Sequence, residues 1–485
     1  MYKERNFKFN ICDIEKQIFE MSESRKLEER DLEIIAGGKM NNKFLASSLA
    51  SLAILTSTGI NTNINIKATN NPATSISDVQ KSDENKQVVE YFTKQQVIED
   101  IDYVMNKVKN SHVGCINGIP DEVLKQKELE IKNLSESTSS VEEWRIISSI
   151  LAKLHDAHTT ILPPAFLYGK RLPFDIEYLD NKIFCRSGEF KDSEITEING
   201  VKISDLYEKF KLHYSYEIEE WVDFNFFRST PFFEQYNLAK AGIDTFKPVE
   251  ISFKTDKGIA KQKFEFIQIE VKFKKSEPFF YQIDKENSVG IFTINKCIIA
   301  NKEFLDTVDK FFADVASNNI ENVIVDLRRN TGGWTGLERF FARYLNKLGN
   351  VTFKKCEIRT NNGIETRQEK YTADETKLIK SDKNLFDGKL FILTSNLTFS
   401  SAMDFALEFS DNNLATIVGE VPGNSPNHYG CCNICDYTPN SKLKFITTTK
   451  KYYRADSTKD PNRLIPDVQV SAKEALNKVY ELIKS

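Results

Sequence analysis

Residues 389–409 read "KLFILTSNLTFSSAMDFALEF", and this stretch contains the pattern that decides the fold. An apolar run typical of a buried strand enters a polar turn, after which Ala402, Phe405, Ala406 and Phe409 repeat at helical spacing. The same alternation continues on both sides, with strands expected at 288–294, 322–327 and 414–419 and helices near 302–317 and from 336. Strands that alternate with helices predict an α/β domain, which we place at residues 277–485.

Two units are expected before this α/β domain. Residues 91–168 form a helical unit, in which Thr93 with Gln96 and Ser140 with Glu143 have the spacing of capping boxes. Residues 169–276 read mostly as strands, with a hairpin turn at Asn199-Gly200. The phrase "ITEINGVKI" at 195–203 resembles a stretch of PDZ-like peptide-binding modules, and an ordinary hairpin has the same pattern.

The N-terminal ninety residues have the pattern of an export signal. Residues 1–38 are a charged leader that ends in "DLEIIAGG", and residues 39–90 contain an apolar segment followed by a polar linker. Lys39 and Lys43 flank Met40, a second possible start, and precede the apolar segment, in which Ser, Thr and Asn recur too often for a stable membrane span. The leader resembles the double-glycine leaders of exported peptides, which are cut after the position of Gly38. We expect a secreted or cell-surface protein; the alternative is a disordered tail followed by an ordinary buried helix.

Charge and cysteine usage exclude other classes of function. The 66 basic and 70 acidic residues leave a net charge of −4, so nucleic acid is not an expected partner. The eight cysteines are scattered except for Cys431, Cys432 and Cys435, which excludes a disulfide framework. These three with His428 are ligand types that zinc uses, but structural zinc sites usually take ligand pairs from two separate elements. A small cysteine-bearing loop explains the cluster as well.

Candidate catalytic groups occur after the predicted strands. Ser400 stands at the start of a helix, where unpaired N–H groups suit either a capping serine or a developing oxyanion. The strand expected at 322–327 ends with Asp326 and Leu327 and is followed by Arg328, Asn330 and the pair Gly332-Gly333. The backbone of paired glycines can approach a reacting carbonyl closely. A general base for the serine must come from one of only five histidines. His155 and His158 follow the same predicted helix, and either could instead cap its carbonyl groups.

Five motifs in order resemble the tail-specific and tricorn-core family of serine peptidases. They are "LHDAHTTI" (154–161), "VIVDLRRNTGG" (323–333), "TFSSAMDFA" (398–406), "IVGEVPGN" (417–424) and "RLIPDVQV" (463–470). The resemblance spans about residues 90–485. It implies a crotonase/ClpP-like catalytic domain preceded by the helical unit and the small strand-rich domain.

The resemblance also implies roles for single residues. The family's nucleophile falls on Ser400, with Gly332, Gly333 and the N–H of Ser401 as the oxyanion hole and Asp326, Arg328 and Asn330 as structural support. The base of the D-x-H-T motif falls on His158. The position of the family's lysine base is Ser425, which excludes the lysine mechanism. The orienting acid falls on Asp460, with Asp456 as a rival, and Arg463 stands where the family usually has glycine.

These residues together predict an exported serine endopeptidase that acts on peptides or proteins through a Ser400 acyl-enzyme. No metal or organic cofactor is expected, and no oligomeric state is predicted. The alternative from another class is a non-catalytic peptide- or ligand-binding protein on the same fold.

Overall fold

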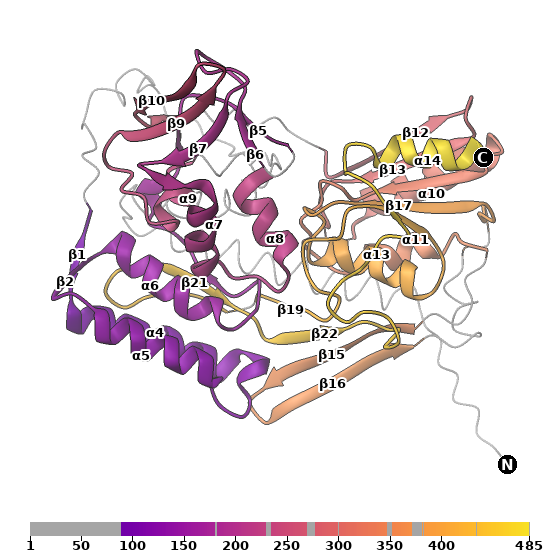
Figure 1. The fold of residues 1–485 in the computed structure, drawn as a ribbon. Helices are drawn as coiled ribbons and strands as arrows, with labels where there is room; N and C mark the ends of the chain where they lie inside the picture. The colour runs from indigo at the N-terminus through magenta and orange to yellow at the C-terminus, as the bar shows by residue number, and fades with distance from the viewer. Residues whose placement is uncertain are drawn as a thin grey trace, which may run out of the picture.

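The computed structural model describes residues 89–179, 182–228, 234–268, 277–298, 300–346, 352–370, 381, 383–432 and 434–484. The leader at 1–38 and nearly all of the segment 39–90 lie outside the described residues. Figure 1 shows the helical unit and the strand-rich unit in one half of the molecule and the α/β unit in the other. Within the described ranges, every helix is too short or too polar to span a bilayer.

The helical unit buries the apolar faces of its helices around Trp144, which is fully buried. Thr93 and Gln96 form the predicted capping box. The box predicted at Ser140 and Glu143 is wrong by one residue, because Ser139 caps the helix through the Glu142 N–H while Ser140 and Glu143 turn into the core. The elements are β1 (Tyr91–Thr93), α4 (Lys94–Ser111), η1 (Val113–Cys115), α5 (Asp121–Asn133), β2 (Ser137–Ser139), α6 (Ser140–Ala152) and η2 (Ala165–Leu167).

The strand-rich unit is built on an antiparallel sheet in the order β10-β9-β7-β6-β5, with β8 paired to β7. The predicted hairpin is confirmed: β7 and β8 pair on either side of Asn199 and Gly200, both of which have positive φ. The elements are β4 (Lys170–Arg171), β5 (Ile176–Leu179), β6 (Lys182–Cys185), β7 (Glu194–Ile198), β8 (Val201–Lys202), α7 (Ile203–Leu212), α8 (Glu219–Asp223), η3 (Phe224–Arg228), α9 (Gln235–Lys240), β9 (Val249–Thr255), β10 (Gly258–Phe264) and β11 (Ile267–Gln268).

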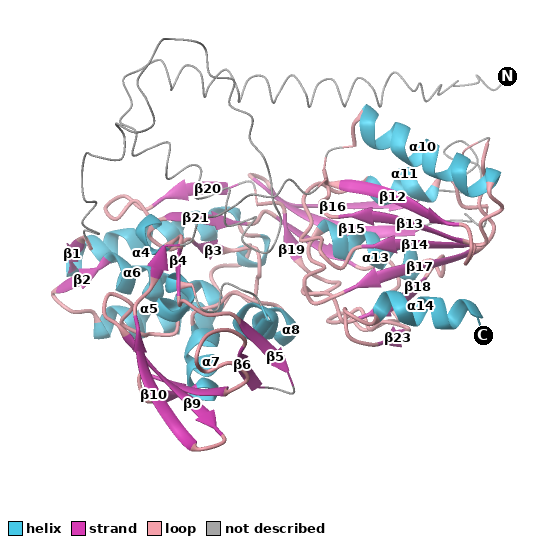
Figure 2. Cartoon of the chain, turned by 90° about the horizontal axis from the view of Figure 1, so that it is seen from above, coloured by secondary structure: helices cyan, strands magenta, loops and turns pink. Residues whose placement is uncertain are grey.

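The α/β unit contains the predicted alternation of strands and helices. Its sheet has the order β12-β13-β14-β17-β18-β23 and is parallel except for β12 (Figure 2). Val323 and Val325 pack toward α10, α11 and α13, whereas Ile324 packs toward α14, so the sheet is covered on both faces. The elements are β12 (Phe279–Asp284), β13 (Val289–Ile294), α10 (Lys302–Ser317), β14 (Asn322–Asp326), α11 (Leu337–Ala342), β17 (Lys389–Thr394), α13 (Ser401–Asp411), β18 (Thr416–Gly419), β23 (Val468–Gln469) and α14 (Ala475–Lys484).

Two further sheets connect the halves of the molecule. One has the order β16-β15-β22-β19, from β15 (Thr352–Thr360), β16 (Gly363–Lys370), β19 (Tyr429–Gly430) and β22 (Lys450–Tyr453). The other joins β20 (Ile434–Tyr437) and β21 (Lys444–Thr447) to β3 (Thr160–Ile161), with Phe445 opposite Ile161. β21 packs against α4 of the helical unit (Figure 1). Since β3 follows His158 closely, this pairing holds the histidine segment against the C-terminal part of the chain.

Candidate active site

The turns that follow β14 and β17 lie side by side, because the two strands are parallel neighbours. Ser395 Oγ donates to the Arg328 carbonyl at 2.6 Å, and Thr398 Oγ1 donates to the Leu327 carbonyl at 2.9 Å. The Phe399 N–H donates to the Asn330 carbonyl at 3.1 Å. The carboxyl ends of parallel strands are the usual place for ligand sites in such sheets. The glycine turn and the serine turn are therefore fixed to each other.

Asp326 and Arg328 stabilise the first of these turns. The guanidinium of Arg328 donates to both oxygens of Asp326, at 2.9 Å from Nε and 2.6 Å from Nη2. Its Nη1 donates to the Ala472 carbonyl at 2.7 Å. This fork holds the backbone after β14 against the end of β23, away from the turn that approaches Ser400.

Ser400 adopts an unusual backbone conformation, with φ 53° and ψ −130°. Its N–H donates to Asn424 Oδ1 at 2.8 Å, and its side chain makes no capping hydrogen bond although it precedes α13 directly. The capping interpretation of this serine is therefore wrong. A non-glycine residue in such a conformation costs about 1–3 kcal/mol, which the surrounding turn must offset. The strained turn leaves the half-buried hydroxyl available at the helix start.

The glycine turn packs directly against Ser400. A Cβ at Gly332 would lie 2.7 Å from the Phe399 carbonyl oxygen, and one at Gly333 would lie 2.0 Å from the Cys297 carbonyl oxygen. The Gly332 N–H already donates to Asn330 Oδ1 at 2.8 Å, so it is not an oxyanion donor here, contrary to expectation. Ser401 Oγ donates to the Gly333 carbonyl at 3.0 Å. Gly333 and the first-turn N–H of Ser401 remain the candidate donors.

His158 reaches the serine turn from the helical unit. Its imidazole lies against the ring of Phe399, with 4.7 Å between centroids, and its side chain is 9% exposed. Neither ring nitrogen has a hydrogen-bond partner among the described residues, and none is formed with Ser400. Burial lowers the pKa of His158 below 6.5, an effect that the charges of Asp156 and Asp404 partly oppose. His155, in contrast, is exposed and lies near Glu122.

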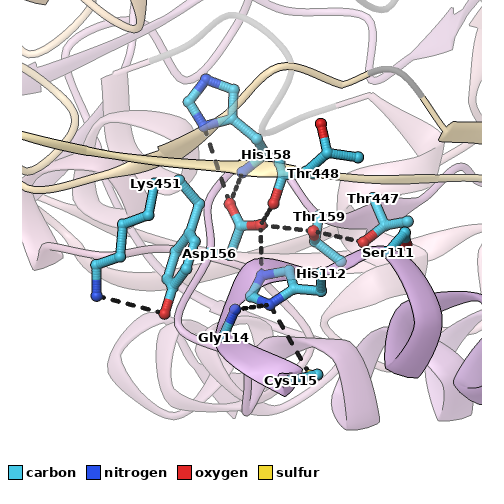
Figure 3. A network of polar contacts seen from close by, with 12 residues as sticks. Ser111, His112, Gly114, Cys115, Asp156, His158, Thr159, Thr447, Thr448 and Lys451 are labelled. Atoms are coloured by element: carbon cyan, nitrogen blue, oxygen red, sulfur yellow. Dashed lines mark hydrogen bonds and ion pairs between the residues drawn. The ribbon is translucent and has the colours of Figure 1, made fainter. Parts of the chain in front are cut away.

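Asp156 organises the segment around His158 (Figure 3). Its Oδ1 accepts the His158 N–H at 2.8 Å. Its Oδ2 lies 3.1 Å from His112 Nε2 and accepts from the hydroxyls of Thr159 and Thr448 at 2.5 Å and 2.7 Å. Burial opposes ionisation, but the bond and charge of His112, the charge of His158 and the Thr159 hydroxyl hold the pKa of Asp156 well below its usual range. An ionised carboxylate thus sits beside the imidazole.

Asp460 does not occupy the expected position. Its exposed carboxylate accepts the N–H groups of Asn462 and Arg463 at 2.8 Å and 3.3 Å within its own turn. Asp456 likewise accepts from Thr458. The turn is tethered elsewhere, because Arg463, in the position where glycine is usual, pairs with Glu220 at 2.7 Å. In this structure the acids whose charges act on His158 are Asp156 and Asp404 instead.

Four residues near the site were not assigned a catalytic role from the sequence. Asn424 Oδ1 accepts the Ser400 N–H, and Asp404 lies in the first turn of α13. The ring of His428 stacks on that of His158 with 6.0 Å between centroids. Its Nε2 lies 3.7 Å from Asp404 Oδ1. Glu217 accepts the N–H groups of Ser425 and Tyr429 at 3.0 Å and 3.2 Å. Asn424 belongs to a recognised motif and could have been found, whereas Glu217 has no local signal.

Glu217 also completes the single group of possible metal ligands among the described residues. Ligand atoms of Asp156, His158 and Glu217 all lie within 4.8 Å of one another. Burial, together with the charge of Asp156, holds the pKa of Glu217 well above its usual range. Among the described residues, the alternative of a zinc site at Cys431, Cys432 and Cys435 is not formed as a compact group.

Comparison with known proteins found similar peptidases. The model of peptidase family S41 matches residues 288–470. The crystal structure of mature CPAF has a TM-score of 0.56 at 11% identity, covering 81% of this chain and 96% of that one, and CPAF complexed with lactacystin has a TM-score of 0.54 at 11% identity, covering 81% and 97%. The photosystem II D1 C-terminal processing protease has a TM-score of 0.41 at 14% identity, covering 81% and 98%. A comparison with curated proteins found no match.

The likeness to CPAF extends the fold beyond the matched segment, since it covers most of both chains. The serine turn, the glycine turn and most of the connecting sheets lie inside residues 288–470. The model of peptidase family S41 matches this segment, and the chain is a serine peptidase.

Proposed function

We propose that the chain is an exported endopeptidase that hydrolyses peptide bonds through an acyl-enzyme on Ser400, with His158 as the general base. The observation that carries the proposal is the strained, uncapped turn at Ser400, which is packed against the glycine turn. A serine on a sharp turn between strand and helix presents its Oγ at the end of the sheet. The imidazole that lies against Phe399, one residue away, supplies the base.

The proposed reaction has two halves. Ser400 Oγ attacks the carbonyl carbon while a ring nitrogen of His158 takes the hydroxyl proton and then gives it to the departing amine. Water then attacks the acyl carbon and loses its proton to the same nitrogen, which passes the proton to Ser400 Oγ as the acyl–oxygen bond breaks and the acid departs. The N–H groups of Gly333 and Ser401 receive the oxyanion, and one such donor contributes about 3 kcal/mol.

The proposal requires the imidazole to move from its stack on Phe399 into a hydrogen bond with Ser400 Oγ. Catalytic hydrogen bonds are often long or absent without substrate and tighten in the Michaelis complex. Asp156 and Asp404, rather than Asp460, then stabilise the charged imidazolium, because their charges already favour it.

A fluorophosphonate probe tests the nucleophile. Labelling is expected in the native chain and in Ser401→Ala, and it is expected to disappear in Ser400→Ala. Ser401→Ala is the matched control because Ser401 is the next residue in the chain. Its hydroxyl donates to the Gly333 carbonyl. Labelling that persists in Ser400→Ala would exclude the assignment. If labelling is lost in both variants, mass spectrometry of the labelled native peptide shows which serine carries the probe.

Export is proposed from the sequence of residues 1–90, and N-terminal sequencing of secreted material tests it. A mature start at Lys39 supports cleavage after the double glycine, whereas a start near Ile60 supports a signal peptidase. Recovery of the protein only inside cells with Met1 intact would contradict export.

A further inference from the structure

We propose that Asp156, His158 and Glu217 form a binding site for a zinc-class divalent cation, and that an ion bound there withholds the imidazole from catalysis. Each residue presents one ligand atom, and these atoms lie within 4.8 Å of one another. The inhibitory half of this proposal rests on the proposed function, whereas the binding half does not.

The first argument is the state of His158. Its side chain is nine-tenths buried, and both ring nitrogens lack a hydrogen-bond partner among the described residues. A buried polar group that has lost its contacts with water costs free energy unless another partner replaces them. One of these nitrogens is the ligand atom that points into the group. A metal ion would supply the missing partner.

The second argument is the remaining capacity of the two carboxylates. Among the described residues, the only hydrogen bond that Asp156 Oδ1 accepts comes from the His158 N–H, and His158 Nδ1 lies 3.9 Å from this oxygen. The contacts with His112, Thr159 and Thr448 all go to Oδ2. Each oxygen of Glu217 accepts one backbone N–H, from Tyr429 and from Ser425. A carboxylate oxygen has two lone pairs, so Asp156 Oδ1 and Glu217 can each still bind a cation. Ligation therefore does not require the loss of the hydrogen bonds that hold the segment.

The chemistry of the three ligands selects the ion. Imidazole with two carboxylates is a set that suits zinc and neighbouring transition metals, whereas calcium and magnesium prefer oxygen ligands alone. Zinc–ligand bonds of about 2.0–2.2 Å need the three atoms to move closer by a small amount. Two carboxyl groups that lie close together in a buried place disfavour the ionisation of one of them, and the charge of a divalent cation offsets this effect.

Binding is measured on the full chain carrying Ser400→Ala, freed of metal by a chelator and titrated with zinc chloride by calorimetry. About one equivalent is expected. His158→Ala and Glu217→Gln, introduced separately, are each expected to weaken binding at least about 10-fold. Glu219→Gln is the matched control, because it removes an exposed carboxylate two residues from Glu217 and should leave the affinity unchanged.

The cysteine cluster is the competing site, and a second set of variants separates it. Conversion of Cys431, Cys432 and Cys435 to serine should leave the zinc affinity unchanged. Cobalt(II) bound to the Ser400→Ala chain should show no thiolate charge-transfer band. Affinity that is unchanged in His158→Ala, or lost in the cysteine variant, would overturn the site.

Inhibition is measured on the chain with Ser400 intact. Peptide hydrolysis should fall by half near the measured zinc dissociation constant and return on addition of a chelator. Binding without inhibition would overturn the second half of the proposal alone. A chain that binds zinc but hydrolyses nothing would contradict the proposed function and leave the site standing.

Discussion

Asp156 shows how one residue prepares the site from inside the molecule. Its carboxylate binds the N–H of His158 on one oxygen and two threonine hydroxyls with His112 on the other. An ionised group in this position orients the histidine segment and favours the protonated imidazole, while burial of the ring acts in the opposite direction. The pH below which activity is lost is therefore set by the balance between the nearby negative charge and the burial of the ring.

The pKa of His158 predicts the pH dependence of catalysis. The base must be neutral, and burial lowers its pKa, so kcat/KM should begin to fall only at a pH below that expected for an ordinary histidine. Asp156→Asn removes a charge that raises this pKa, and the limb should therefore move to still lower pH. Rate profiles between pH 4 and pH 8 measure both. A limb above pH 7, or one that moves upward in Asp156→Asn, would contradict this role of His158.

Replacing Gly333 and Gly336 by alanine separates the cost of a positive φ from the cost of a steric clash. Gly333→Ala places a Cβ 2.0 Å from the Cys297 carbonyl oxygen, whereas Gly336→Ala has the same kind of positive φ with open space around it. We expect Gly336→Ala to cost about 1 kcal/mol from strain. Gly333→Ala should cost about 1–3 kcal/mol more and lower kcat at least about 10-fold, because the oxyanion turn must shift. Thermal unfolding and steady-state kinetics of both variants decide this, and equal effects would contradict it.

At the scale of elements, α8 of the strand-rich unit supports the serine turn. Trp221 stacks on Phe399 with 4.3 Å between centroids, and Phe399 in turn lies against His158. These rings form a small apolar cluster with Leu397 at the place where all three units meet. The order of the rings puts Phe399 between α8 and the proposed base.

Trp221→Ala should therefore affect catalysis as well as stability. We expect a loss of about 3–5 kcal/mol in the free energy of unfolding, typical of a buried tryptophan, together with a lower kcat. Trp221→Phe keeps the ring contact and should restore most of kcat. Trp334→Ala is the control, because Trp334 is 53% exposed. Urea unfolding and kinetics test this, and a kcat equal to that of the native chain in Trp221→Ala would show that the stack does not position the site.

At the scale of the whole molecule, buried acids join the helical unit to the C-terminal part. Ser441 Oγ lies 2.7 Å from Asp100 Oδ2 and 2.8 Å from Glu143 Oε1, so residues of α4 and α6 meet the turn before β21. Burial, reinforced by the neighbouring Asp100, raises the pKa of Glu143 to about 9. The neutral form of Glu143 is thus the form that the folded protein favours.

This shift gives the stability of the whole chain a definite pH dependence. A folded-state pKa raised from 4.5 to about 9 contributes stability that is complete below pH 4.5 and is lost as the pH rises through about 9. Between these values the loss is at most about 1.4 kcal/mol per pH unit. Glu143→Gln should flatten this part of the curve, and the exposed neighbour Glu142→Gln should not. Urea unfolding at several pH values measures it, and parallel curves for all three proteins would contradict it.

The elements that local patterns describe were predicted well. The strand–turn–helix at 389–411, the alternation around it, the capping box at Thr93 and the hairpin at Asn199 all depend on neighbours within a few residues. The box at Ser140 was misplaced, because Glu143 is drawn into the core by contacts with Ser441, far away in the sequence. The same difference separates the site residues. Ser400, Gly333 and His158 lie in motifs, whereas Glu217 and His428 reach the site only through long-range packing.

The amino-acid sequence by itself determined the α/β class, the serine turn and the histidine segment, since periodicity, turn chemistry and short motifs are properties of contiguous residues. Only the tertiary structure decided which acid stands beside His158, which glycine N–H is already occupied, and that Glu217 completes a group of three ligands. Those outcomes depend on competition for hydrogen bonds among segments brought together by β3 pairing with β21 and by adjacent parallel strands. No local pattern encodes the result of that competition.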